Sequence, residues 1–137
     1  MDDVRFILEN LRTWAVVGCS GDEFRDSHRI ARLLQSRGYR VIPVNPEVDE
    51  VLGERCYPVL PAGQGIEVVD LFRRSSAVSE HVDEAIAIGA KAVWMQIGVI
   101  NEEAAAKAEA AGLKVVMDRC PKIEIPRLGL KRIAAEA

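Results

Sequence analysis

The residues best suited to binding an anion come directly after short apolar runs of the sequence. Small residues and an arginine follow the first run, and further arginines follow the third and fifth runs: Gly18, Cys19, Ser20, Arg25, Arg73, Arg74 and Arg119. A guanidinium group binds phosphate through parallel hydrogen bonds, and an apolar slot accepts an adenine ring. Apolar residues stand beside these cations: Val44, Pro46, Phe72 and Ile97. The pattern favours a ligand with several phosphates and an adenine, although each arginine alone also fits a solvated loop.

The same segments offer few groups for catalysis. His28 lies at the start of a predicted helix, His81 lies inside a predicted surface helix, and Asp118 stands beside Arg119, which we expect it to orient. These residues do not assemble into a Ser-His-Asp arrangement, a carboxylate pair or a His/Cys cluster at metal-ligand spacing. We therefore expect a binding protein without intrinsic catalysis and without a metal.

The elements that position these residues begin with a β-α-β unit over residues 14–46. An apolar strand over 14–17 ends at Gly18, Ser27 is expected to cap the following helix, and Gly38 is expected to end it. A second apolar strand over 41–44 closes on Asn45 and Pro46. Small residues between the first strand and the helix allow backbone N–H groups and the helix N-terminus to face an anion.

Strands and helices alternate through the rest of the chain. Apolar positions predict a helix from Val4 to Leu11, strands over 66–72, 92–95 and 113–117, and helices over 78–86 and 101–111. Residues 47–66 are a long connection with one helical turn expected over 48–52, and the basic tail from Lys122 is expected to finish as a short helix through Ala135. This alternation predicts an α/β fold: a Rossmann-like, doubly wound, parallel five-stranded sheet in a single domain. Ligands of such sheets bind beyond the carboxyl ends of the strands.

Composition narrows the classes of protein further. The chain has 137 residues, 49% of them apolar, and a net charge of −3, so we expect a core of ordinary size and no electrostatic footprint for nucleic acid. No apolar run approaches a membrane span, and the acidic, periodic N-terminus does not fit a signal peptide, which favours the cytoplasm. Three cysteines without a CxxC pair argue against a disulfide framework.

A nicotinamide or flavin dinucleotide is the alternative ligand, and the residues fit it poorly. Its fingerprint is G-x-G-x-x-G with an acid at the end of the second strand. Counting from Gly18, the second and third glycine positions hold Ser20 and Glu23, and the second strand ends Val44-Asn45 without a carboxylate. A dinucleotide-dependent oxidoreductase remains the enzyme alternative.

The runs GYRVIPVNP, VDLFRR, VWMQIG and VMDRC, together with GCSGDEFRDSHRIARLLQSR, resemble the small stand-alone CoA-binding proteins. Their domain is similar to the CoA-binding domain of succinyl-CoA synthetase and of ADP-forming acyl-CoA synthetases. The resemblance implies a CoA-binding domain over residues 14–128, preceded by a helix within 1–13 and followed by a tail over 129–137. It implies coenzyme A or an acyl-CoA as ligand, and either a homodimer or a partner subunit of the acyl-CoA synthetase type. A non-catalytic subunit of a split synthetase is thus a further alternative.

The resemblance also assigns parts of the ligand to positions of this chain. Gly18, Cys19 and Ser20 would wrap the pyrophosphate, with Arg25 and Ser27 nearby. The adenosine would lie at Val44, Asn45 and Pro46, and the pantetheine or phosphates at Phe72, Arg73 and Arg74. The remaining wall would be Gln96, Ile97 and Gly98, with Arg119 beyond it. A helix N-terminus and Arg25 near Cys19 would lower its thiol pKa, which suggests a mixed disulfide with CoA; a small residue chosen for a tight loop is the alternative.

Overall fold

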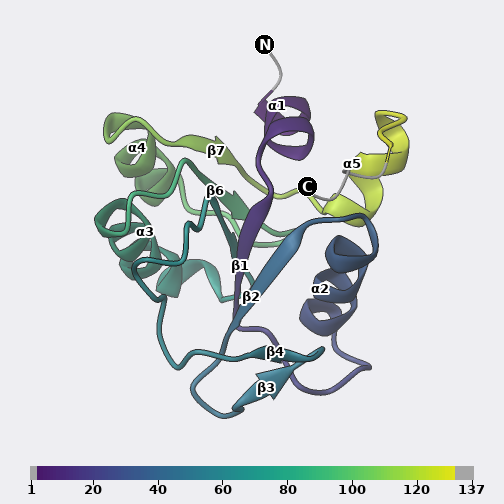
Figure 1. Cartoon of the computed structure of the whole chain (residues 1–137). Helices are drawn as coiled ribbons and strands as arrows, with labels where there is room; N and C mark the ends of the chain where they lie inside the picture. The colour runs from purple at the N-terminus through teal and green to yellow at the C-terminus, as the bar shows by residue number, and fades with distance from the viewer. Residues whose placement is uncertain (1–2, 132–137) are drawn as a thin grey trace.

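The computed structural model describes residues 3–131 as a central parallel sheet with helices on both faces (Figure 1). The elements in chain order are α1 Asp3–Asn10, β1 Thr13–Val17, α2 Asp26–Ser36, β2 Arg40–Val44, β3 Glu50–Val51, β4 Glu54–Arg55, β5 Val68–Leu71, a 3-10 turn Ser75–Ala77, α3 Val78–Ala87, β6 Ala92–Met95, α4 Glu102–Ala110, β7 Lys114–Val116 and α5 Pro121–Arg127. The predicted α/β, Rossmann-like fold is confirmed.

The five strands of the main sheet lie in the order β2-β1-β5-β6-β7, and all neighbouring pairs are parallel. The chain therefore moves outward from β1 to β2 in one direction, and from β1 through β5 to β7 in the other. The switch in direction falls between β1 and β5. Their carboxyl ends are in register, since Val17 pairs with Leu71. This is where open α/β sheets place a ligand-binding crevice.

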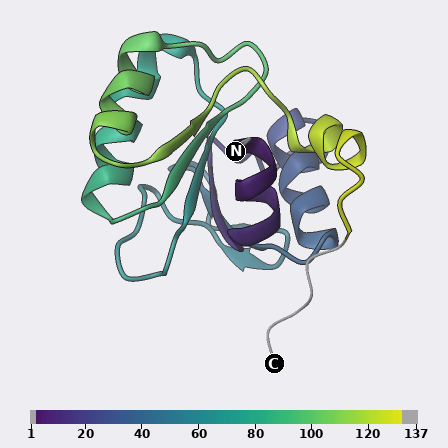
Figure 2. The same cartoon turned by 90° about the horizontal axis from the view of Figure 1, so that it is seen from above.

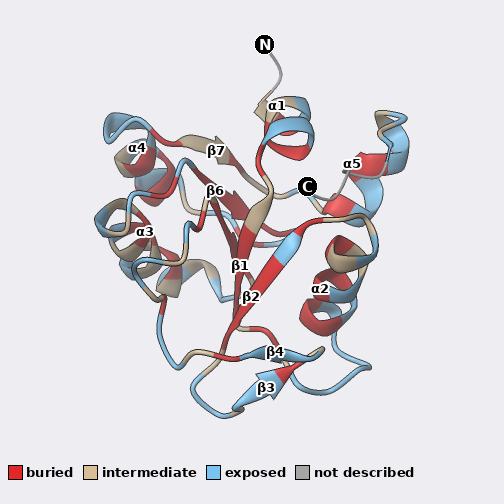
Figure 3. Cartoon of the chain, viewed as in Figure 1, coloured by how far each residue is buried: buried red, intermediate tan, exposed pale blue. Residues whose placement is uncertain are grey.

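Each strand sends alternate side chains to opposite faces of the sheet. Trp14 and Val16 of β1 join the core beneath α1, α2 and α5, whereas Ala15 and Val17 join the core beneath α3 and α4. Seen from above, the two helical layers flank the sheet (Figure 2). Buried residues line the strands and the inward helix faces, and exposed residues concentrate on the outer helix faces and the β3-β4 hairpin (Figure 3).

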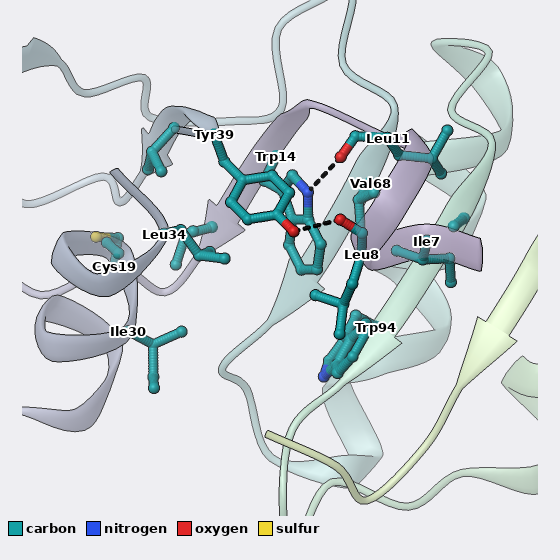
Figure 4. Close-up of a cluster of buried hydrophobic side chains, with 14 of the residues drawn as sticks. Ile7, Leu8, Leu11, Trp14, Cys19, Ile30, Leu34, Tyr39, Val68 and Trp94 are labelled. Carbon is teal, nitrogen blue, oxygen red and sulfur yellow. Dashed lines mark hydrogen bonds between the residues drawn. The ribbon is translucent and has the colours of Figure 1, made fainter. Parts of the chain in front are cut away.

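A cluster around Trp14 and Trp94 joins α1 to the sheet (Figure 4). The two indole rings lie 5.4 Å apart between centroids, and the Tyr39 ring meets Trp14 edge-on at 5.5 Å. Trp14 Nε1 donates a hydrogen bond to the carbonyl of Leu11 at 3.1 Å, and the Tyr39 hydroxyl donates to the carbonyl of Leu8. These bonds satisfy the polar atoms of large aromatic side chains inside an apolar core.

The long connection after β2 differs from the prediction. The helical turn expected over 48–52 is wrong, because β3 and β4 pair as a short antiparallel hairpin. Leu52 and Gly53 between them both have positive φ, 54° and 77°, as a two-residue hairpin turn requires. The connection then returns along the outer edge of β2, where the Tyr57 N–H donates to Pro43 O at 3.0 Å and the Asn45 N–H donates to Tyr57 O at 2.9 Å. Pro43 is tolerated because β2 is an edge strand.

Helix ends agree with the sequence signals in some places and not in others. Asn101 caps α4 by accepting from the Ala104 N–H at 2.9 Å, as expected, and Gly38 has the positive φ of a residue that ends a helix, 98°. The expected cap at Ser27 is wrong, since α2 begins at Asp26 with Arg25 at the N-cap position. α5 begins at Pro121, earlier than predicted; the expected continuation to Ala135 falls on residues 132–137, outside the described part of the chain.

Candidate ligand-binding site

Three adjoining clefts run along the carboxyl edge of the sheet, and Phe72 lines all of them. The strand-two cleft, of about 510 Å³, lies beyond β2. The loop cleft, of about 380 Å³, lies between the β1-α2 loop and the start of α2. The helix-side cleft, of about 580 Å³, lies between α2, the end of β6 and the start of α5. Ligand sites typically have volumes in this range.

The loop after β1 is fixed by its contact with the end of β5. Gly18 has φ +84°, and a Cβ built on it would lie 2.4 Å from the carbonyl oxygen of Phe72 and 3.4 Å from Cδ of Arg73. The N–H groups of Gly18 and Cys19 both donate to the carbonyl of Val44, at 2.9 and 3.2 Å. These two amides thus hold the ends of β1 and β2 together, and any ligand there meets other groups of the loop.

Ser20 is held by the first turn of α2. Its N–H donates to Ser27 Oγ at 2.9 Å, and its carbonyl lies 3.0 Å from His28 Nδ1. Ser27 and His28 are both buried. Their side chains therefore anchor the loop, while Asp26 and Ser27 line the loop cleft at the helix N-terminus, where backbone N–H groups have no partner within the helix.

Cys19 does not have the environment that a reactive thiol requires. It is fully buried in the core beneath α2, where Figure 4 shows it close to Ile30 and Leu34. Burial, with smaller contributions from the charges of Cys56 and Asp70, raises the pKa of the Cys19 thiol to about 12. The expected lowering of its pKa is wrong, and the small-residue alternative explains this position.

The strand-two cleft combines an apolar wall with polar groups from two sides. Its apolar wall and basic rim are formed by Val44, Pro46, Pro58, Val59, Leu60, Arg25 and Arg73. The Asn45 side chain bridges the strand ends, since its Nδ2 donates to Cys19 O and its Oδ1 accepts from the Glu47 N–H, both at 2.9 Å. His81 and Glu84 of α3 line the opposite side and contact each other at 2.7 Å. The expectation that His81 is simply solvated missed this position, because the sequence did not show that α3 borders the cleft beyond β2.

The helix-side cleft has a basic rim over an apolar base. Its lining includes the predicted binding residues Phe72, Arg73, Arg74, Gln96 and Ile97, Cys120 from the predicted strand-end loop after residue 117, and others that sequence reasoning missed: Asp26, Arg29, Ile30, Val99 and Lys122. Arg29 follows Asp26 by one turn at the start of α2, and this spacing was the available signal for it. Lys122 lines the cleft because α5 begins at Pro121, earlier than the sequence suggested.

Asp70 is a fully buried carboxyl group near this cleft. It lies in β5 between Val16 and Trp94 of the neighbouring strands, and Gln96 Nε2 donates to its Oδ1 at 2.6 Å. Burial raises the pKa of Asp70 to about 8, and the Gln96 hydrogen bond opposes that rise. An acid inside the apolar run Val68-Val69-Asp70-Leu71 was a signal that the sequence analysis did not use.

Besides the buried Cys19, two predicted site residues line none of the three clefts. Gly98 has φ +83°, and its N–H donates to Asp118 Oδ1 at 2.8 Å. Arg119 is exposed and lines none of the three clefts; its Nη1 donates to the backbone carbonyl of Asp118 at 3.0 Å. The Asp118 side chain thus fixes the β6-α4 loop, and a binding role for Arg119 stays a prediction.

Residues 3–131 contain no group of three or more His, Cys, Asp or Glu side chains that is arranged to hold a metal ion. No helix in the same range is both long and apolar enough to cross a membrane.

The sequence and the fold are both similar to those of known proteins. The family described as "CoA binding domain" matches residues 12–126. A hypothetical protein from Pyrococcus horikoshii OT3 has a similar structure, with a TM-score of 0.89 and 43% identity over 95% of this chain and 94% of that chain. The uncharacterized protein YneT of Bacillus subtilis (strain 168) is 37% identical over 88% of this chain and 90% of its own length. Acetate–CoA ligase [ADP-forming] I of Archaeoglobus fulgidus is 27% identical over 77% of this chain, which spans only 17% of the ligase.

Proposed function

Because the chain belongs to the family of CoA-binding domains, we propose that it binds coenzyme A or an acyl-CoA along the carboxyl edge of its sheet. The observation that supports this proposal most strongly is the row of three clefts that share Phe72 and are bordered by Arg25, Arg73 and Arg74. A ligand with an adenine, phosphates and a long flexible arm needs such an elongated site with cations near its middle.

The adenosine end is assigned to the strand-two cleft. Val44, Pro46 and Leu60 offer apolar surface for the flat base, and the Asn45 side chain is already held in place by two hydrogen bonds. A rigid slot binds an aromatic ring without first having to be ordered.

The phosphates are assigned to the junction of the loop and strand-two clefts. Arg25 lines both of these clefts, and the Arg73 stem lies against Gly18, which also lines both. Ser20, Asp26 and Ser27 bring the start of α2 to the same place. Helix N-termini and arginines both stabilise phosphate charge. Gly18 and Cys19 would shape this junction through their bonds to Val44 rather than through free amides.

The pantetheine arm is assigned to the helix-side cleft. Phe72 and Ile97 give it apolar walls, Arg74 lies on the rim, and Gln96 offers a polar group among them. A CoA thiol or an acyl group would then lie between α2 and α5. Nothing in this assignment requires a chemical step, and binding without intrinsic catalysis is part of the proposal.

Calorimetric titration with CoA, dephospho-CoA and NAD tests the proposed function. We expect CoA to bind, dephospho-CoA to bind more weakly, and Arg73→Ala or Arg25→Ala to weaken CoA binding about tenfold, the value of one hydrogen bond to a charged group. Arg5→Ala is the matched control, since Arg5 lies in α1 and pairs with Glu9 on the surface at 3.8 Å. Binding of NAD without CoA would reopen the oxidoreductase alternative and refute the proposal.

A second candidate, a CoA-binding subunit that works with a synthetase-type partner, is favoured by one observation. The ADP-forming acetate–CoA ligase carries a segment similar to this chain within a much longer protein. Co-purification with a nucleotide-grasp subunit, followed by a CoA-dependent ligase assay of the pair, tests this candidate; a chain that remains alone at micromolar concentrations would speak against it.

A further inference from the structure

Asp70 is the most unusual polar residue of the fold, because half of its carboxyl group has no partner. Oδ1 accepts from Gln96, whereas Oδ2 is buried and meets no hydrogen-bond partner among the described residues. A buried polar atom without a partner costs about 1–3 kcal/mol. Leu or Val would fill this position in the apolar strand without that cost. The carboxyl group therefore needs a reason other than packing.

Gln96 connects Asp70 to the helix-side cleft. Its side chain is only 5% exposed, yet the residue lines the cleft. Nε2 of its amide is engaged by Asp70 at 2.6 Å, and no donor among residues 3–131 meets the amide oxygen. One polar atom of Gln96 is thus fixed by the buried acid, and the other remains for a ligand.

We propose that Asp70 positions the Gln96 amide so that its outer polar atom binds a secondary amide in the arm of the ligand. The inference rests on the proposed function, because the pantetheine arm of CoA carries secondary amides while an adenine nucleotide without the arm has none. Gln96 is then the residue that distinguishes an arm-bearing ligand from a bare nucleotide, and Asp70 acts through it as a positioning residue. Mostly apolar clefts obtain specificity from a few polar groups of this kind.

The protonation state of Asp70 limits which atom Gln96 presents. Burial raises the pKa of the carboxyl group to about 8. An ionised Asp70 only accepts, so it holds the NH₂ group and leaves the oxygen facing outward; a protonated Asp70 can also donate to the Gln96 oxygen, which turns the NH₂ group toward the cleft. The other titratable groups that interact with Asp70 are the thiols of Cys19 and Cys120, whose pKa values are both raised by burial. In either state one hydrogen-bonding atom faces the arm, and a secondary amide carries both a donor and an acceptor.

The test compares two ligands that differ only in the pantetheine arm: CoA and adenosine 3′-phosphate 5′-diphosphate. Calorimetry gives the dissociation constant of each for the wild type and for Gln96→Leu, Asp70→Leu, the double variant and Asp70→Asn. Gln64→Leu is the control, since Gln64 bonds Arg40 near the start of β2 and lies outside the three clefts.

We expect Gln96→Leu to weaken CoA binding about tenfold and to leave the armless nucleotide within about twofold, since one hydrogen bond is lost. Asp70→Leu should weaken CoA similarly, and the double variant should be no worse than either single one, because both remove the same interaction. Asp70→Asn retains a hydrogen-bonding side chain and should restore CoA binding to within about threefold of the wild type.

Four results would overturn the inference. CoA binding that Gln96→Leu leaves unchanged refutes it while the proposed function stands. Additive effects of the two leucine substitutions, or equal losses for both ligands, would show a general disturbance of the fold instead of positioning. If the wild type binds neither ligand, the proposed function fails and the inference fails with it.

Discussion

Gly18→Ala is the substitution for which the structure gives the most definite prediction. The new methyl carbon would start 2.4 Å from the Phe72 carbonyl oxygen, a distance that real Cβ contacts essentially never show. The obstacle is backbone at the end of β5, so it cannot move aside by a rotamer change. Either the β1-α2 loop or the end of β5 has to shift.

The magnitude has two parts. An alanine in the left-handed region costs about 1–2 kcal/mol, and overpacking a close contact typically costs about 1–3 kcal/mol more. Gly18→Ala should therefore lower the free energy of unfolding by about 2–5 kcal/mol. Gly53→Ala is the matched control: its φ of +77° is close to the +84° of Gly18, but a Cβ there would meet nothing within 4 Å. Gly53→Ala should therefore show only the cost of placing an alanine in the left-handed region.

Urea unfolding of the wild type and both variants measures the two parts separately, with the slope of each transition checked for two-state behaviour. CoA titration of the same proteins then reports on the site, and Gly18→Ala should lose affinity through the shift of Phe72, while Gly53→Ala should not. A Gly18→Ala variant no less stable than Gly53→Ala would refute the reasoning, because the close approach to Phe72 would then carry no energetic weight.

Two further changes test the core. Burial raises the pKa of Asp70 from its ordinary value of 3.8 to about 8, so between these two pH values the folded protein keeps a proton that the unfolded chain has lost. Stability should therefore fall as pH rises from about 4 to 8, by up to about 1.4 kcal/mol per pH unit relative to Asp70→Asn; parallel stability profiles of the two proteins in chemical denaturation would contradict this. Tyr39→Phe removes the hydroxyl that donates to the buried Leu8 carbonyl and should cost about 1–2 kcal/mol, whereas Tyr57→Phe, whose ring stacks under Arg55 at 4.7 Å, should cost less in the same urea assay.

The fold could be predicted from the sequence because its signals are local. Apolar runs bounded by glycine, such as the strand before Gly18 and the helix before Gly38, fix both the type and the ends of an element. Asn101 caps its helix through a bond that spans only three residues. The hairpin after β2 was missed because Leu52 needs a positive φ that its residue type does not signal.

The site was predictable only in part, because some of the residues that line it come from elements that are distant along the chain. Strand ends are known once strands are known, so Phe72, Arg73 and Gln96 were predicted to lie at the carboxyl edge of the sheet, where they line the helix-side cleft. His81 and Lys122 reach the clefts through the packing of α3 and the early start of α5, which depend on contacts across the fold. Ser27 lies at the start of α2, as predicted, but its hydrogen bond differs from the prediction. Its hydroxyl accepts from the Ser20 N–H and does not cap the helix.

The outer edge of β2 bears on how this protein behaves at high concentration. An uncovered edge strand is a template on which another chain can add a strand and begin aggregation. Here Pro43 lacks the N–H that an incoming strand would need, and Tyr57 already occupies the neighbouring backbone groups of Pro43 and Asn45. The opposite edge, β7, is only three residues long. Both borders of the sheet are thus poor templates, and the protein can keep open clefts at its carboxyl edge without its sheet growing sideways into fibrils.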